Sequence, residues 1–178
     1  IGLWFSLRGK GLDDVFVVEP SPIRRAAIEA LGAATLDPTA TDVPAFIADH
    51  TKGNGADAVF DAAGVTPAVA TALACVGSRK PMISVAIYEK PLETPLLNLV
   101  MNESRIQGSL CYTGADFEAV IGLMADDKYD TTGWVTRIAL DDVIDEGFEA
   151  LHAGTKMKVL VAPTDSAEVA PTDSAEVA

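Results

Sequence analysis

Short apolar runs alternate with amphipathic stretches along most of the chain. Residues 15–18 are continuously apolar, which is typical of a strand that is covered on both faces. Ser21 offers an N-cap and Pro22 suits the first position of a helix that Gly32 would end. Repetition of this strand–helix unit predicts parallel β-α-β connections with right-handed crossovers, and therefore a doubly wound, parallel α/β sheet of the Rossmann type.

The same alternation predicts the other elements. We expect strands at 34–36, 58–60, 82–87 and 106–112, with 82–87 the longest buried one, and helices at 42–50, 66–76 and 95–102. After residue 112 the pattern changes to a helix at 117–124, a strand at 135–140, a helix at 144–151 and a strand at 156–161. This later part could extend the sheet or belong to a neighbouring domain, and periodicity does not distinguish the two possibilities.

The length of 178 residues, of which 49% are hydrophobic, suits one domain, or one domain with an incomplete piece of another. We expect a domain at 1–112, a segment at 113–162 and a tail at 163–178 that contains PTDSAEVA twice. This octapeptide is polar and shorter than the ~20 residues of a solenoid repeat, so we expect a disordered tail without function.

Charge and cysteine content exclude several classes of protein. The 26 acidic and 13 basic residues give a net charge of −13, which argues against nucleic-acid binding. Two cysteines, Cys75 and Cys111, exclude a disulfide-dense scaffold or a four-cysteine zinc ribbon and fit a reducing compartment. No apolar run approaches the ~20 residues of a membrane span, and the first residues do not resemble a signal peptide. We therefore expect a cytoplasmic protein that binds neither nucleic acid nor membrane.

Glu19 lies at the carboxyl end of the first predicted strand, where doubly wound sheets bind their ligands. A carboxylate there can accept hydrogen bonds from both ribose hydroxyls of an adenosine and repels a 2′-phosphate, which favours NAD over NADP. Gly2 precedes Glu19 by 17 residues, close to the spacing of about 20 between a glycine fingerprint and its acidic residue. Alternatively, Glu19 is a polar strand end. Asp61, before a turn of small residues, fits a plain turn as well as a cofactor wall.

Other polar groups favour structural roles. His50 and His152 end predicted helices without a metal-ligand partner at i+3 or i+4, so we expect surface positions. Cys111 is expected to be a small core residue. No nucleophile elbow or pair of carboxylates stands out. The residue patterns alone therefore predict a dinucleotide-binding fold and no catalytic residue.

Several segments, in order along the chain, resemble the medium-chain zinc-dependent alcohol dehydrogenases, in particular the 2,3-butanediol dehydrogenase-like branch. They are VEPSP at 18–22, LGA at 31–33, FDAAG at 60–64, VAIYEKP at 85–91, GSLCY at 108–112 and GFE at 147–149. The resemblance extends from residue 1 to about residue 162. It implies an oligomeric enzyme that transfers hydride between a small secondary alcohol or diol and NAD, with zinc as the Lewis acid.

On the adenosine side of the cofactor, the resemblance implies roles for four residues. Gly2 matches the last glycine of the phosphate-binding loop, Glu19 the acidic residue that holds the ribose, and Arg24 a basic residue beside it. Lys158 resembles the basic residue that reaches the pyrophosphate, although an exposed lysine on an alternating strand explains it equally well.

On the nicotinamide side, the resemblance implies roles for two short segments. Ala62, Ala63 and Gly64 match the segment that lines the cofactor cleft. Ala86, Ile87 and Tyr88 match the backbone that contacts the nicotinamide amide. Residues 109–111 match the last strand, at the nicotinamide and the subunit interface.

Family members begin with a catalytic domain that supplies the zinc ligands. That domain, the first Rossmann strand and the first two loop glycines have no counterpart here. We therefore expect the C-terminal, cofactor-binding part of such an enzyme, inactive alone, with no catalytic or metal-ligating residue and with exposed sheet edges. The alternatives are a non-catalytic nucleotide-binding or regulatory Rossmann module and a methyltransferase, whose sheet is wound in the same way.

Overall fold

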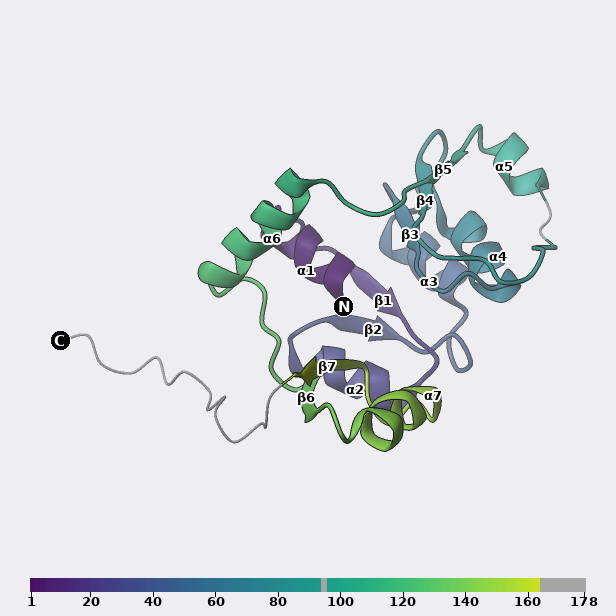
Figure 1. The fold of residues 1–178 in the computed structure, drawn as a ribbon. Coiled ribbons are helices and arrows are strands. Elements are labelled where there is room, and N and C mark those ends of the chain that lie inside the picture. Colours follow the sequence, from purple (N-terminus) through teal and green to yellow (C-terminus); the bar gives the residue numbers. More distant parts are fainter. Residues whose placement is uncertain (94–95, 164–178) are drawn as a thin grey trace.

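The structure is a computed structural model that describes residues 1–93 and 96–163. Figure 1 shows its ribbon, with the elements labelled in chain order. The elements are α1 (Gly2–Gly9), β1 (Phe16–Val18), α2 (Pro22–Ala30), β2 (Ala34–Leu36), α3 (Val43–His50), β3 (Val59–Asp61), α4 (Thr66–Cys75), β4 (Pro81–Ser84), α5 (Leu97–Met101), β5 (Arg105–Gly108), α6 (Gly114–Ala125), β6 (Val135–Ala139), the π-helix η1 (Val143–Glu149), α7 (Ala150–His152) and β7 (Lys158–Ala162). The predicted tail, apart from Pro163, lies outside the described residues.

All the strand pairs of the described residues are parallel, and helices alternate with strands, so the predicted α/β class is confirmed. The strands form three groups, β1–β2, β3–β4–β5 and β6–β7, in place of the single sheet expected. In the strand order of a dinucleotide-binding sheet, the second and fourth strands flank the first and do not pair with each other. The separation of β1 from β3 agrees with that order.

Local sequence signals place the helix ends where we expect them. The Ser21 hydroxyl accepts the N–H of Arg24 at the start of α2, and Gly32 adopts a φ of +94° just after its end. Because the left-handed region is open to glycine without a steric penalty, Gly32 can turn the chain into β2. None of the helices in the two described ranges combines the length and the hydropathy that crossing a bilayer requires.

β4 and β5 end several residues before the predicted positions. β4 ends at Ser84, because the chain turns there and the Tyr88 hydroxyl reaches back to Ser84 and Asp61. β6 and β7 are longer, with five residues each, but β6 has one buried residue and β7 has none, whereas Met82 and Ser84 of β4 are buried. β5 ends at Gly108, and Cys111 adopts a φ of +57°, which a strand does not allow. The prediction that residues 109–111 belong to the last strand is wrong.

The core consists of three apolar clusters. In the first, Trp4 and Phe5 of α1 pack on Ile28 of α2. Tyr129, which follows α6, stacks on Phe5 with ring centroids 4.5 Å apart, and α1 and α6 lie side by side in Figure 1. The chain after residue 112 therefore contacts the N-terminal half of the protein. It does not extend the sheet, because β6 pairs only with β7 among the described strands.

The other two clusters pack the helices against the strands. Leu36 of β2 is buried with Val43 and Ile47 of α3. Leu73 of α4 and Met82 of β4 are among the most buried side chains, with exposed fractions of 2% and 1%. These contacts fix β2 and β4, and therefore the loops that leave their carboxyl ends.

Candidate functional site

Polar side chains lie at the carboxyl ends of three parallel strands. Glu19 directly follows β1, Asp37 follows β2 and Asp61 is the last residue of β3. The loop of residues 85–88 leaves the carboxyl end of β4, the strand next to β3. Ligands of doubly wound sheets bind beyond these strand ends, so a cofactor site is expected at the loops that follow them.

Asp61 is a buried carboxylate with an exposed fraction of 3%. Its Oδ1 accepts the N–H groups of Ala63 at 3.0 Å and Gly64 at 3.2 Å. Its Oδ2 accepts the hydroxyl of Tyr88 at 2.6 Å. The Tyr88 oxygen also lies 2.6 Å from the Ser84 hydroxyl. One carboxylate thus fixes the turn after β3 and the loop after β4 to each other.

The backbones of these two loops are in close contact at Gly64. Gly64 has a φ of +68°, and a Cβ on it would lie 2.9 Å from the carbonyl oxygen of Ile87 and 3.1 Å from the Cβ of Ala86. The structure therefore brings together residues 62–64 and 86–88, the two segments for which the sequence implies cofactor contacts. The side chain of Tyr88 is turned toward Asp61, which leaves the backbone of its loop for a ligand.

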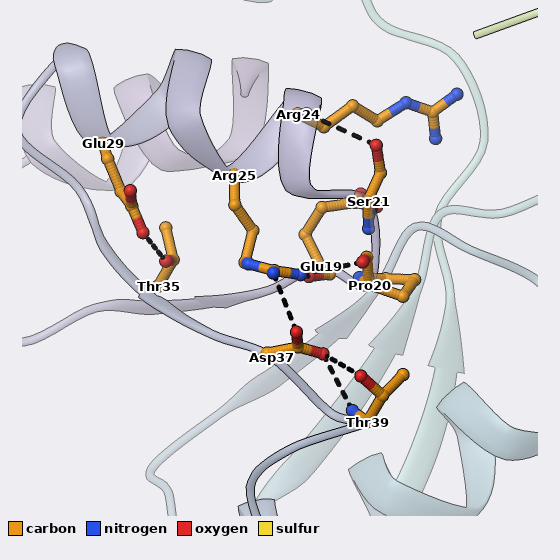
Figure 2. A network of polar contacts seen from close by, with 9 residues as sticks. All are labelled: Glu19, Pro20, Ser21, Arg24, Arg25, Glu29, Thr35, Asp37 and Thr39. Atoms are coloured by element: carbon orange, nitrogen blue, oxygen red, sulfur yellow. Dashed lines mark hydrogen bonds and ion pairs between the residues drawn. The ribbon is translucent and has the colours of Figure 1, made fainter.

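Glu19 is held at the end of β1 by bonds to both its backbone and its side chain. Its N–H donates to the carbonyl of Leu36 at 3.1 Å. Its Oε1 accepts the N–H of Ser21 at 2.9 Å. Within residues 1–93 and 96–163, no hydrogen bond reaches its Oε2. Figure 2 shows the carboxylate at the centre of a polar network that joins β1, α2 and β2.

Arg25 and Asp37 complete this network, and sequence analysis did not identify either of them. Nη1 of Arg25 donates to the carbonyls of Glu19 at 2.7 Å and Pro20 at 2.8 Å. Nη2 of Arg25 lies 2.7 Å from Oδ2 of Asp37. The Thr39 hydroxyl and N–H lower the pKa of Asp37, and Arg25 lowers it further. The sequence signal was weak, because a second arginine on a helix is usually a solvated residue.

Arg24 lies differently from its neighbour. Its side chain is exposed and in Figure 2 leads away from Glu19 and Asp37. Arg24 is therefore free of the internal network, whereas Arg25 is part of it.

Comparison with known proteins assigns the family. Residues 5–126 match the model of a family described as zinc-binding dehydrogenase. The chain belongs to the medium-chain zinc-dependent dehydrogenases. It is 36% identical to (R,R)-butanediol dehydrogenase of Bacillus subtilis, over 89% of this chain and 46% of that protein. It is 30% identical to 2-dehydro-3-deoxy-L-galactonate 5-dehydrogenase of Pseudoalteromonas atlantica, over 83% of this chain and 44% of that protein.

Solved structures of dehydrogenases agree with this assignment. The crystal structure of 2R,3R-butanediol dehydrogenase from Bacillus subtilis superposes with a TM-score of 0.81. The superposition covers 90% of this chain and 46% of the chain in that crystal structure. The alcohol dehydrogenase of Aeropyrum pernix, at 21% identity, has the same fold with a TM-score of 0.75. The chain spans less than half the length of the relatives it matches. The predicted resemblance to this family is confirmed.

Two further residues that the dehydrogenase resemblance singled out take no part in the hydrogen bonds of the Glu19 and Asp61 networks. Gly2 begins α1, and a Cβ on it would lie 3.1 Å from the hydroxyl of Tyr129. Gly2 therefore lies close to Tyr129, in the loop after α6. Lys158 is exposed on β7, opposite Val135 of β6. Among the described residues, no hydrogen bond or ion pair links Lys158 to either network.

The side chains that the structure describes do not form a site that fits a zinc ion. In the described ranges, no group of three His, Cys, Asp or Glu side chains is placed to hold a metal. His50 is on the surface, as predicted, and its Nε2 lies 2.9 Å from Asp14. Cys75 is buried, but Cys111 is exposed, so the predicted core position of Cys111 is wrong. We assign no step of a zinc-dependent reaction to these residues.

Alkaline pH should destabilise the folded chain in part through the buried thiol of Cys75 and the half-buried phenol of Tyr88. Burial, followed by the hydrogen bond to Asp61, raises the pKa of Tyr88, and burial raises the pKa of the Cys75 thiol to about 11. Folding therefore favours both neutral forms. Their contribution is complete below the ordinary pKa values of about 8.5 for Cys and 10 for Tyr, and is lost as pH rises through the folded values. We expect the urea concentration at the unfolding midpoint to be lower at pH 11 than at pH 8.

The matched variants for this experiment are Cys75→Ala and Tyr88→Phe, each compared with its own midpoint at pH 8. Burial also raises the pKa of Tyr129, which both variants retain. Each variant lacks either the Cys75 thiol or the Tyr88 phenol, so its midpoint should fall less steeply than that of the native chain. If the midpoints of the native chain and of both variants fall by the same amount between pH 8 and pH 11, these two side chains do not cause the loss of stability.

Proposed function

We propose that this chain binds NAD(H) and forms the cofactor-binding part of an NAD-dependent dehydrogenase of secondary alcohols or diols, with 2,3-butanediol-like substrates. The observation that carries the proposal is the fixed carboxylate of Glu19 beyond the end of β1. A carboxylate at this place accepts the ribose hydroxyls of NAD and repels the 2′-phosphate of NADP. The bound cofactor would accept or supply a hydride, whereas this chain would bind and orient it.

The second support is the contact between residues 62–64 and 86–88. The two backbone segments meet at Gly64 and form a wall beside the carboxyl ends of β3 and β4. We assign the nicotinamide half of the cofactor to this wall. Gly2, Arg24 and Lys158 remain predicted contacts of the phosphates and the adenosine, and of these Arg24 and Lys158 have exposed side chains.

The arrangement of strands supports a further part of the proposal. β1 and β3 each pair on one side only within the described residues. In the dinucleotide-binding order, the first strand lies between them. We propose that residues 1–112 form an NAD-binding domain without that strand, and that 113–162 return to a catalytic domain that supplies the zinc ligands. Such a chain is inactive by itself, and its complete protein is a cytoplasmic homo-oligomer.

A second candidate function is a regulatory nucleotide-binding module without catalysis. The two functions predict the same binding of NAD(H) and differ in turnover by the complete protein. The family assignment argues against the methyltransferase alternative.

Titration calorimetry of the chain with NADH and with NADPH tests the proposal. We expect tighter binding of NADH, and we expect Glu19→Gln to weaken it by about tenfold or more, because a charge-assisted hydrogen bond contributes about 1.5–3 kcal/mol. The control is Glu118→Gln, which removes the same charge from an exposed position on α6 and should change neither affinity.

Three results would contradict the proposal. They are no binding of NADH by the native chain, equal affinities for the two dinucleotides, and an unchanged affinity in Glu19→Gln. A separate assay with NAD and 2,3-butanediol should show no turnover above a heat-treated control. Turnover by this chain would refute its proposed inactivity.

A further inference from the structure

We propose that Arg25 is a positioning residue for the ribose-binding carboxylate, and that it acts by fixing the turn that carries Glu19. Its guanidinium does not contact the cofactor in this proposal. The inference rests on the proposed function, because it assumes that Glu19 binds the ribose of NAD(H).

The contacts of Arg25 join three pieces of the chain. The guanidinium is a rigid plane with five N–H donors, so it can hold several acceptors in one fixed arrangement. Here one nitrogen donates to the consecutive carbonyls of Glu19 and Pro20, and another pairs with Asp37. The side chains of Arg25 and Asp37 are only 18% and 24% exposed. Figure 2 shows the guanidinium between the turn and the end of β2.

These contacts leave the Glu19 backbone little freedom. Its N–H is bonded to the carbonyl of Leu36, and its own carbonyl is bonded to Arg25. Leu36 and Asp37 are adjacent at the end of β2, so one strand end anchors the residue on both sides. The carboxylate then needs only the Ser21 N–H to set its direction. Without Arg25, the carbonyls of Glu19 and Pro20 would lose this donor. The part of the turn that they hold would then become ordered only when the ligand binds, and that ordering would weaken binding.

A different role for Arg25 would be direct contact with a 2′-phosphate, because an arginine near this strand end can accommodate NADP. The geometry favours positioning. The Arg25 nitrogens already bond two carbonyls and a carboxylate, and Asp37 balances its charge. Arg24, whose side chain is exposed, is the arginine left for a ligand.

A double-mutant cycle tests the proposal, with NADH affinity measured by calorimetry in the native chain, Arg25→Met, Glu19→Gln and the double variant. Ordering one side chain weakens binding by about three- to tenfold. We expect Arg25→Met to weaken NADH binding by this factor in the native background, and by less than about twofold when Glu19 is already replaced. Arg25→Lys should recover only part of the loss, because an ammonium cannot hold three acceptors in one plane.

The control is Arg79→Met, which removes an arginine from an exposed ion pair with Glu103. It should leave NADH affinity unchanged. Should Arg25→Met unfold, Arg25→Lys and Asp37→Asn replace it in the same cycle with Glu19→Gln.

Two outcomes overturn the inference alone. One is an equal loss of affinity in both backgrounds, which means that Arg25 acts independently of Glu19. The other is a greater loss for NADPH than for NADH, which means direct phosphate contact. If the native chain does not bind NADH, the proposed function fails and this inference fails with it. If the native chain binds NADH through Glu19 but the cycle is additive, only the inference fails.

Discussion

Replacement of Asp61 by alanine should lower the free energy of unfolding by about 3 kcal/mol, because it leaves three partly buried donors without their acceptor. Asp61 accepts the N–H groups of Ala63 and Gly64 and the hydroxyl of Tyr88, and it is 3% exposed. The carboxylate itself is shielded from water, so a water molecule must enter the space that it leaves before these bonds are replaced. The loop after β4 would also lose its attachment to β3. The loss is measured by urea unfolding, from the midpoint and from the slope of the free energy against urea concentration.

Asp57→Ala is the matched control for this experiment. Asp57 is 93% exposed and forms a surface ion pair with Lys80, so its removal should cost less than about 1 kcal/mol. Asp61→Asn should fall between the two variants, because an amide keeps one acceptor oxygen but adds donors. Equal midpoints for Asp61→Ala and Asp57→Ala would show that the buried network contributes nothing to stability.

Replacement of Gly64 by alanine should also destabilise the chain, by about 2–3 kcal/mol. Its φ of +68° lies in the left-handed region, where a side chain costs about 1–2 kcal/mol. The new Cβ would lie 2.9 Å from the carbonyl oxygen of Ile87, so one of the two loops must move. Because that carbonyl belongs to the proposed nicotinamide wall, NADH affinity should fall together with stability.

Gly108→Ala is the control for Gly64→Ala. Gly108 lies at the end of β5, and a Cβ there meets nothing within 4 Å. Thermal unfolding compares the two variants, and hydrogen exchange at 62–64 and 86–88 localises the change. If Gly64→Ala melts at the same temperature as Gly108→Ala, or exchanges no faster at these loops, the close contact does not restrict the wall.

Both predictions concern contacts that the sequence did not reveal. Asp61 fitted a cofactor wall and a plain turn equally well, because a carboxylate after a strand suits both. What decides its role is Tyr88, which lies 27 residues later and completes the network from the loop after β4. That contact also ends β4 at Ser84, where the apolar pattern continued to residue 87. A pattern of apolar residues cannot register a bond between two loops.

The sequence by itself determined the elements and their parallel arrangement. Continuous apolar runs predict strands that are covered on both faces. Capping residues next to a helix, such as Ser21 and Gly32, predict where it begins and ends. It also placed Glu19 at a strand end, because that position follows from the strand alone. These features depend on residues within one or two turns of each other, which is why they could be predicted.

Only the tertiary structure decided which neighbouring groups act together. It assigned Arg25 to the Glu19 turn and left Arg24 exposed, although the two are adjacent and identical in type. It placed Cys111 at the surface and divided the strands into three groups. These outcomes depend on which strand end, loop or helix face lies opposite a residue. The residues that meet in this way are far apart in the sequence, so no local pattern contains the information. The free energy of burial and of pairing in the folded chain determines which of them come together.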